Sequence, residues 1–183
     1  MSKVYVFLAD GFEEIEALTV VDLLRRAKVY VDTVSITDDY TVRGAHGIPV
    51  QTEDLITEID FKESDMSVLP GGMPGTTNLK EDENVRKAVQ EAYDDGRYVA
   101  AICAAPTILA DMGLLKGKRA TCYPDMESEI EDAYLTGAPV ATDENIITSQ
   151  GVGTAIDFAL KLIEVLISEE KAVEIADSIV YQR

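Results

Sequence analysis

Residues 99–106 read VAAICAAP, and this stretch decides how the chain is expected to fold. Its first four residues are apolar and suit a buried strand, whereas Pro106 suits the first turn of a helix, where its missing N–H needs no partner. Cys103 lies between the two, with the small residues Ala101 and Ala105 two positions to either side. This spacing is typical of a nucleophile elbow, a sharp strand-to-helix turn that exposes one reactive side chain.

The expected elbow also predicts an activated thiol. A cysteine at a helix N-terminus meets the positive end of the helix dipole and unpaired backbone N–H groups, so the pKa of Cys103 is expected below its usual value of about 8.5. The alternative is a buried cysteine that packs as a small hydrophobic side chain, which is the commoner role of cysteine. The spacing of the elbow favours the reactive interpretation.

Strand-like and helix-like segments alternate on both sides of the elbow. Strands are expected at 4–8, 29–36, 66–69, 98–102, 119–122, 140–141 and 145–149, and helices at 13–27, 84–94, 104–112, 125–134, 153–168 and 171–179, with a small hairpin at 40–50. Such alternation predicts a mainly parallel sheet with helices on both faces. Ligands in these sheets bind at the C-terminal ends of the strands.

Length, composition and charge favour one cytoplasmic domain. A chain of 183 residues with 46% hydrophobic content can bury one core, so residues 1–183 are expected to form a single domain. The apolar stretches are too short to cross a membrane, no signal peptide is evident, and two cysteines cannot build a disulfide scaffold. The net charge of −18 repels nucleic acids and anionic membranes, although it also has the simpler interpretation of keeping the protein soluble.

Three acidic residues begin the first expected helix, just beyond the end of the first expected strand. Glu13, Glu14 and Glu16 would all complement the helix dipole, and for Glu13 this interpretation suffices. Glu16 differs because it lies near the buried margin of the helix. A carboxyl group beside a thiolate in an apolar crevice would have a raised pKa and would donate a hydrogen bond to sulfur. Periodicity alone leaves the structural and functional interpretations of Glu16 equally open.

Two glycine-containing loops follow strands at the same edge of the sheet. Residues 70–76 read PGGMPGT, which is too rich in glycine and proline for regular structure. Backbone N–H groups of this loop, together with that of Ala104, would suit an oxyanion hole, with an ordinary tight turn as the alternative. Residues 149–154 (SQGVGT) have N-capping as an equally good explanation. Neither loop has a P-loop lysine or dinucleotide-binding spacing, so no cofactor or metal is expected.

Four segments resemble, in order, the signature segments of the DJ-1/PfpI superfamily in its DJ-1/ThiJ/YajL branch. They are LADGFEEIEAL at 8–18, VLPGGMPGTTNL at 68–79, AAICAAPTILA at 100–110 and TSQGVGTAIDFAL at 148–160. The resemblance spans nearly the whole chain and implies a flavodoxin-like three-layer α/β sandwich. It also implies that Cys103 is a reactive, oxidisable cysteine, that Glu16 is the carboxylic acid hydrogen-bonded to it, and that Gly72 and Ala104 are the backbone donors around it.

Two departures limit what the resemblance implies. Peptidase-like members carry histidine directly after the cysteine, whereas this chain has Ala104, so peptidase activity is disfavoured. DJ-1 has a histidine before a proline near its pocket, but here Tyr123 precedes Pro124, and a mechanism that uses that histidine lacks it. His46 stands about where DJ-1 has an arginine that reaches the partner's pocket. It is either an accessory acid or anion binder, or an idle turn histidine.

A homodimer is expected because this branch usually forms one, and Arg26 matches an arginine near the dimer interface of DJ-1. The first helix, with Leu23 and Leu24 near Arg26, and the hairpin at His46 are the expected contact patches.

Two classes of function remain open. The first is a cofactor-independent enzyme of glyoxalase or deglycase type that acts on small reactive carbonyls such as methylglyoxal, or on their adducts, through Cys103 and Glu16. The second is a non-catalytic redox sensor or chaperone-like protein, in which peroxide oxidises Cys103 to sulfinate. Thiazole biosynthesis, a label used in the family, is a weaker third possibility that no motif supports. Cys122 has no activating neighbour in the sequence and is interpreted as structural.

Overall fold

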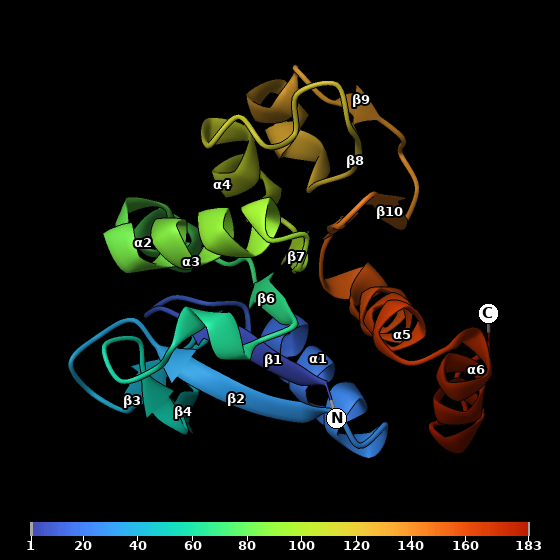
Figure 1. The fold of residues 1–183 in the computed structure, drawn as a ribbon, viewed down its shortest axis with the longest axis horizontal. Coiled ribbons are helices and arrows are strands. Elements are labelled where there is room, and N and C mark those ends of the chain that lie inside the picture. The colour runs from blue at the N-terminus through green and yellow to red at the C-terminus, as the bar shows by residue number, and fades with distance from the viewer. Residues whose placement is uncertain (1, 183) are drawn as a thin grey trace.

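The structure, a computed structural model, describes residues 2–182. Its centre is a seven-stranded sheet in the order β10-β11-β7-β6-β1-β2-β5 (Figure 1). The strands are β1 (Lys3–Leu8), β2 (Tyr30–Ser35), β5 (Asp54–Leu55), β6 (Met66–Leu69), β7 (Tyr98–Ile102), β10 (Val140–Asp143) and β11 (Ile146–Ser149). Neighbouring strands pair in parallel except β10 and β11. The order β2-β1-β6-β7-β11 is the flavodoxin-like arrangement, which confirms the predicted fold class.

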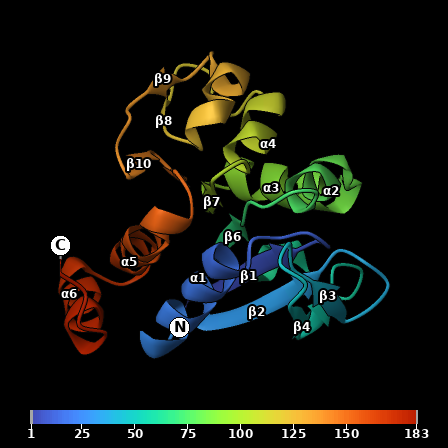
Figure 2. The same cartoon turned by 180° about the vertical axis from the view of Figure 1, so that it is seen from behind.

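Helices cover both faces of this sheet (Figures 1 and 2). One face carries α1 (Glu14–Arg26), α5 (Ala155–Leu166) and α6 (Glu169–Ser178), and the other carries α2 (Gly75–Glu81), α3 (Glu83–Asp94) and α4 (Pro106–Asp111). Strand β1 shows why both faces are apolar. Val4, Val6 and Leu8 pack in the cluster with α1 and α5, while Tyr5 and Phe7 pack in the cluster with α3 and α4. Because successive side chains of a strand point to opposite faces, a strand between two helix layers must be apolar throughout.

Two small ribbons stand outside the central sheet. The expected hairpin is present as β3 (Thr41–Arg43) paired antiparallel with β4 (Pro49–Gln51). The expected strand at 119–122 is shorter, as β8 (Arg119–Ala120), and it pairs with the unexpected β9 (Tyr134–Leu135).

The prediction of a helix at 125–134 is wrong. A 3₁₀ segment, η2 (Pro124–Ile130), takes its place, and Ile130 is its single buried residue. A helix on the protein surface is held mainly by an apolar stripe that packs on the core, and one buried side chain provides no such stripe. Two further 3₁₀ segments, η1 (Phe61–Glu63) and η3 (Val152–Thr154), were not expected either, and η3 precedes α5.

The glycine-rich loop also differs from the expectation, because α2 begins within it at Gly75. A Cβ atom at Gly75 would lie 2.6 Å from the backbone nitrogen of Phe12. The glycine therefore permits close approach of two backbones rather than breaking a helix.

The apolar dimer patch expected around Arg26 needs correction. Leu23 and Leu24 are 3% and 0% exposed and belong to the core. The exposed apolar residues of these two segments are instead Ile15 on α1, 52% exposed, and Ile48 beside β4, 51% exposed.

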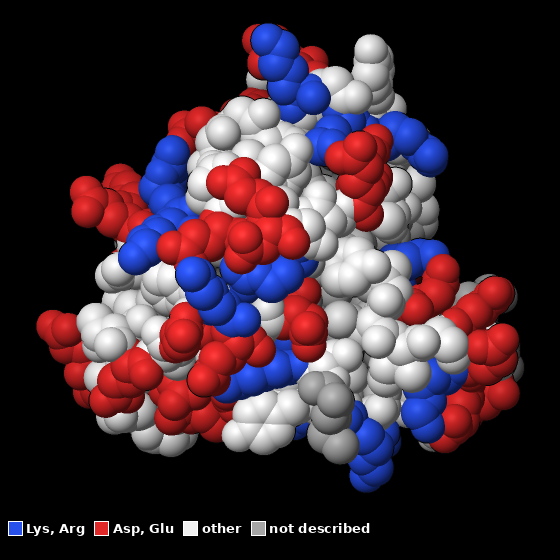
Figure 3. Space-filling model, in the orientation of Figure 1, with Lys and Arg blue, Asp and Glu red and all other residues white. Residues whose placement is uncertain are grey.

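Among residues 2–182, no helix is long and apolar enough to cross a membrane. On the face drawn in Figure 3, acidic side chains surround smaller groups of Lys and Arg, in keeping with the net charge of −18.

Candidate functional site

Cys103 occupies a strained turn between β7 and α4. Its φ of 65° lies in the left-handed region, which costs a residue with a side chain about 1–2 kcal/mol. Two backbone hydrogen bonds hold this conformation. The Cys103 N–H donates to the Ser149 carbonyl at 3.0 Å, and the Tyr123 N–H donates to the Cys103 carbonyl at 2.8 Å. The expected elbow is thus present, with the thiol half-buried.

Glu16 lies beside this thiol, on the first turn of α1, and its side chain is 0% exposed. The Gly71 N–H donates to its Oε2 at 2.9 Å. Its Oε1 is buried and has no hydrogen-bond partner among residues 2–182. A buried polar atom without a partner is costly in a folded protein, so this oxygen marks a place where a proton or a ligand is expected to act.

The carboxyl and the thiol perturb each other. Burial raises the pKa of Glu16 to about 7, although the Cys103 thiol and the Gly71 N–H act in the opposite direction. Burial and the Glu16 carboxylate raise the pKa of Cys103 to about 12, against the effect of the Ala104 and Gly72 N–H groups. A proton on Glu16 therefore favours a thiolate at Cys103, and the titrations of the two groups are coupled.

The lowered pKa expected for Cys103 is not found beside an ionised Glu16. The expectation considered only the helix terminus, but α4 begins three residues further on, at Pro106, and has six residues. The unfavourable burial of charge and the neighbouring carboxylate outweigh the favourable N–H groups.

A pocket of about 480 Å³ opens over the sulfur. It is lined by Glu13, Glu16, Gly72, Cys103, Tyr123, Pro124, Gln150, Gly151, Val152, Gly153 and Thr154. One point in it is defined by the position of a Cβ atom on Gly151. That point is 3.6 Å from Tyr123 Cδ2, 3.8 Å from Glu16 Oε1 and 3.9 Å from Cys103 Sγ. An aromatic edge, a carboxyl oxygen and a sulfur thus converge at contact distance.

The Gly72 and Ala104 N–H groups both lower the pKa of the Cys103 thiol. Gly72 is also sterically required. Its φ is 92°, and a Cβ atom there would lie 2.3 Å from the backbone nitrogen of Glu13. The loop at 70–76 can therefore approach α1 only with glycine at this position.

The two accessory candidates lie outside the pocket of this chain. His46 Nδ1 is 2.8 Å from Glu14 Oε2 and 3.6 Å from Glu13 Oε2, with 67% of the side chain exposed. Arg26, at the far end of α1, donates from Nε to Asp22 at 2.7 Å.

Within the described residues, Glu13, Glu14 and His46 form the one group whose ligand atoms lie close enough for a metal, within 4.8 Å of one another. Both oxygens of Glu14 already bond to His46, and the positive end of α1 opposes a cation. The group therefore resembles an ion-pair cluster more than a metal site.

Several lining residues were missed by the sequence analysis. Glu13 was assigned to the helix dipole alone, yet it accepts a hydrogen bond from the Ile15 N–H at 3.5 Å and also lines the pocket. For Gln150 and Val152, the sequence offered no indication of a pocket beyond the glycine-containing loop in which they lie.

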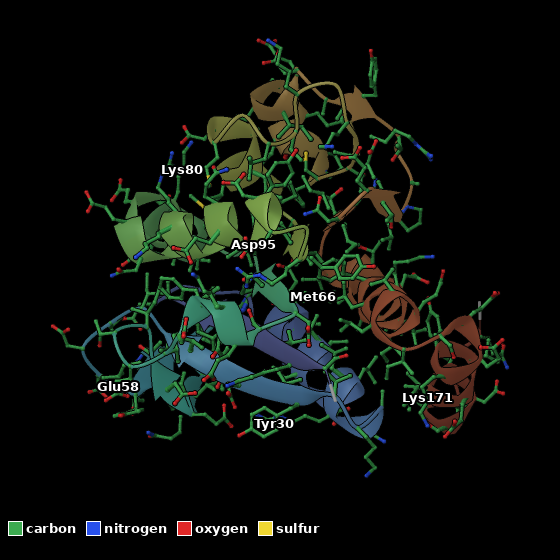
Figure 4. The ribbon with its side chains drawn as sticks, in the orientation of Figure 1. Tyr30, Glu58, Met66, Lys80, Asp95 and Lys171 are labelled. Carbon is green, nitrogen blue, oxygen red and sulfur yellow. The ribbon has the colours of Figure 1, made fainter. Side chains whose placement is uncertain are left out.

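A second cavity of similar volume lies between α2 and α4 and does not include the Cys103 sulfur. Its two cations, Lys80 (Figure 4) and Arg86, both pair with Asp111.

Comparisons with known proteins place this site in context. The model of the DJ-1/PfpI family matches residues 2–165. Protein DJ-1 homolog B of Arabidopsis thaliana is 39% identical over 97% of the chain, which spans only 41% of that protein. The glutathione-independent glyoxalase DJ-1 of Schizosaccharomyces pombe is 34% identical, with 93% of this chain and 94% of that protein covered. The oxidised form of Toxoplasma gondii DJ-1 superposes with a TM-score of 0.95 at 35% identity, with both chains covered completely.

Proposed function

This chain belongs to the DJ-1/PfpI family, and from that premise we propose that it is a cofactor-independent enzyme that acts on reactive carbonyls. Its substrates are 2-oxoaldehydes such as methylglyoxal, or their early adducts on thiols and amines, and its reacting groups are Cys103 and Glu16. The observation that carries the proposal is Glu16 Oε1, a buried carboxyl oxygen that has no hydrogen-bond partner in the described part of the chain and lies near the same point as the Cys103 sulfur. The similarity to a glyoxalase of Schizosaccharomyces pombe supports the reaction class.

The reaction starts with a thiolate on Cys103 and a proton on Glu16. The sulfur adds to the aldehyde carbon, and the alkoxide that forms takes the proton of Glu16, which leaves a neutral hemithioacetal and a carboxylate. The Gly72 and Ala104 N–H groups, which lower the pKa of Cys103, favour the thiolate that starts the reaction.

The carboxylate of Glu16 then moves one proton. It removes the hydrogen of the former aldehyde carbon as a proton, and through an enediol the proton returns to the neighbouring ketone carbon. Two electrons pass from the first carbon to the second within the substrate, so no external oxidant or reductant is needed. Water hydrolyses the resulting 2-hydroxy thioester to a 2-hydroxy acid and restores the thiol with its shared proton.

The raised pKa of Glu16, about 7, suits this role. A carboxyl group with its pKa near the working pH is populated both as acid and as base, which proton transfer in both directions requires. Peptidase chemistry is not proposed, because Ala104 stands where peptidase-like relatives have histidine.

A second candidate function is a redox sensor, and the same donors favour it. Peroxide oxidises a thiolate first to sulfenate and then to sulfinate, with one water released at each step. Sulfinate oxygens on Cys103 would meet the Gly72 and Ala104 N–H groups and accept a charge-assisted hydrogen bond from protonated Glu16. The oxidised form of a similar Toxoplasma gondii protein supports this candidate.

The test is lactate formation from methylglyoxal by the wild type, Cys103→Ala and Cys122→Ala. Cys122 is 0% exposed and does not line the pocket, so its variant is the matched control. We expect activity in the wild type and in Cys122→Ala and none in Cys103→Ala, after subtraction of spontaneous conversion in buffer. Equal lactate formation by all three proteins would refute the enzymatic proposal. Assays with a preformed hemithioacetal of N-acetylcysteine distinguish deglycase from glyoxalase activity by whether the adduct is consumed faster than it releases free methylglyoxal.

A further inference from the structure

The charge of the pocket points to a class of ligand. Among its lining residues the ionisable carboxyls are Glu13 and Glu16, and none of the lining residues is Lys, Arg or His. An anionic carbonyl compound, such as a 2-oxo acid or a phosphorylated aldehyde, would lie beside Glu13, and the nearby His46 lies outside the pocket lining and already pairs with Glu13 and Glu14. Buried charges without partners are strongly disfavoured, and the net charge of −18 opposes the approach of anions as well.

Apolar side chains also line the pocket, and among them Tyr123 has its backbone hydrogen-bonded to the elbow. The Tyr123 N–H donates to the Cys103 carbonyl, and the Met126 N–H donates to the Tyr123 carbonyl, both at 2.8 Å. The backbone of Tyr123 is therefore tied to the elbow itself. Tyr123 is 44% exposed and Val152 is 43% exposed. Together with Pro124, these two residues line the pocket with apolar surface. An exposed aromatic wall next to a reactive atom is a surface that a ligand can cover.

The size of the pocket agrees with a substituent larger than a methyl group. A volume of about 480 Å³ lies within the usual range of small-molecule sites. A small dicarbonyl whose reacting carbon sits between Cys103 Sγ and Glu16 Oε1 leaves most of this space to water. A flat apolar substituent on the same carbonyl would extend along the Tyr123 ring, whose Cδ2 lies 3.6 Å from that point.

We propose that this pocket selects uncharged carbonyl compounds that carry an apolar, preferably aromatic, substituent, and that Tyr123 sets the preference. The substrate class rests on the proposed function, since it concerns the same sulfur and carboxyl. The selectivity itself does not require turnover, because it follows from the lining of the pocket.

The first experiment compares phenylglyoxal with methylglyoxal as substrates of the wild type, Tyr123→Phe and Tyr123→Ala, with mandelate and lactate as products. The wild type should have a higher kcat/KM for phenylglyoxal. Tyr123→Phe keeps the aromatic face and should keep the ratio of the two kcat/KM values, whereas Tyr123→Ala should lower it about tenfold. An unchanged ratio in Tyr123→Ala would overturn the assignment of Tyr123, and a wild-type preference for methylglyoxal would overturn the substrate class.

The second experiment measures selectivity without turnover. Rates of alkylation of Cys103 by iodoacetate, iodoacetamide and iodoacetanilide are divided by the rates for N-acetylcysteine, which removes differences in intrinsic reactivity. Iodoacetate should be disfavoured about fivefold or more relative to iodoacetamide, and Glu13→Gln should reduce this discrimination. Iodoacetanilide should be favoured, and Tyr123→Ala should abolish that advantage.

The two experiments separate the two proposals. If no dicarbonyl is turned over but the alkylation rates follow the expected order, the proposed function fails while the selectivity of the pocket stands. If iodoacetate reacts as fast as iodoacetamide after normalisation, or iodoacetanilide gains nothing, the inferred selectivity is wrong even for an active enzyme.

Discussion

The substitution Glu16→Gln should stabilise the folded protein, and the gain should grow with pH. The pKa of Glu16 rises from 4.5 to about 7 on folding, chiefly because the carboxyl is buried. Between these two values the folded state holds a proton that the unfolded state has lost, so stability falls as pH rises through this window. Above the folded pKa the loss is complete. The difference between the folded and unfolded pKa values of Glu16 corresponds to roughly 3–4 kcal/mol of stability.

Glutamine removes this loss and keeps the local contacts. Its amide oxygen can still accept the Gly71 N–H, which donates to Oε2 of Glu16 at 2.9 Å. Relative to the wild type, Glu16→Gln should gain about 1 kcal/mol at pH 5.5 and about 3 kcal/mol at pH 8. Urea unfolding followed by circular dichroism, at one fixed protein concentration, measures both values.

A matched control separates burial from loss of charge. Glu83 is an exposed acidic residue on the first turn of α3, as Glu16 is a buried one on the first turn of α1. Glu83→Gln should show no comparable difference between the two pH values. If the free energies of unfolding of Glu16→Gln and the wild type change equally with pH, then the carboxyl is not held protonated by burial, and the shared proton on which the mechanism depends is absent.

The remaining predictions concern chemistry and assembly. Glu16→Gln should keep the fold but lose most turnover of methylglyoxal, since an amide cannot accept and return a proton, and retained activity would leave Glu16 a positioning role only. Cys103 should be alkylated faster than the buried Cys122, because Cys103 is only half-buried and two backbone N–H groups act on its sulfur, and equal labelling of both cysteines across pH 5–8 would contradict the site. Under graded peroxide, peptide mass analysis should find two added oxygens on Cys103 first, and prior oxidation of Cys122 would remove the basis of the redox candidate. We also propose a homodimer in which the exposed Ile15 and Ile48 contribute contacts, and a monomer mass in sedimentation at micromolar concentration would exclude it.

The elements near the elbow were predictable because their signals are local. The strand at 98–102 coincides with β7, and Pro106 begins α4, since apolar runs and proline act through neighbouring residues. The helix expected at 125–134 failed for the opposite reason. Its residues permit a helix, but only Ile130 finds a place in the core, and the sequence does not state how much surface a neighbour will cover.

Glycine illustrates the same limit at the site. The sequence marks residues 70–76 as irregular, yet Gly75 begins a helix, and Gly72 is required by the backbone of Glu13. Both requirements come from α1 and the turn before it, which are far away in the sequence. Sequence composition shows where glycine occurs, but it does not show which distant backbone segment packs against that glycine.

The sequence by itself determined the alternation of strands and helices and the single cysteine on an elbow, because hydrophobic periodicity and turn geometry are properties of consecutive residues. Only the tertiary structure decided how Cys103 and Glu16 perturb each other's pKa. The sequence predicted a lowered pKa for Cys103 from its helix terminus, whereas burial and the carboxylate of Glu16 raise it. A pKa depends on solvent exclusion and on charges within a few ångströms, and these are fixed only when α1, β7 and the loop at 70–76 meet at one edge of the sheet.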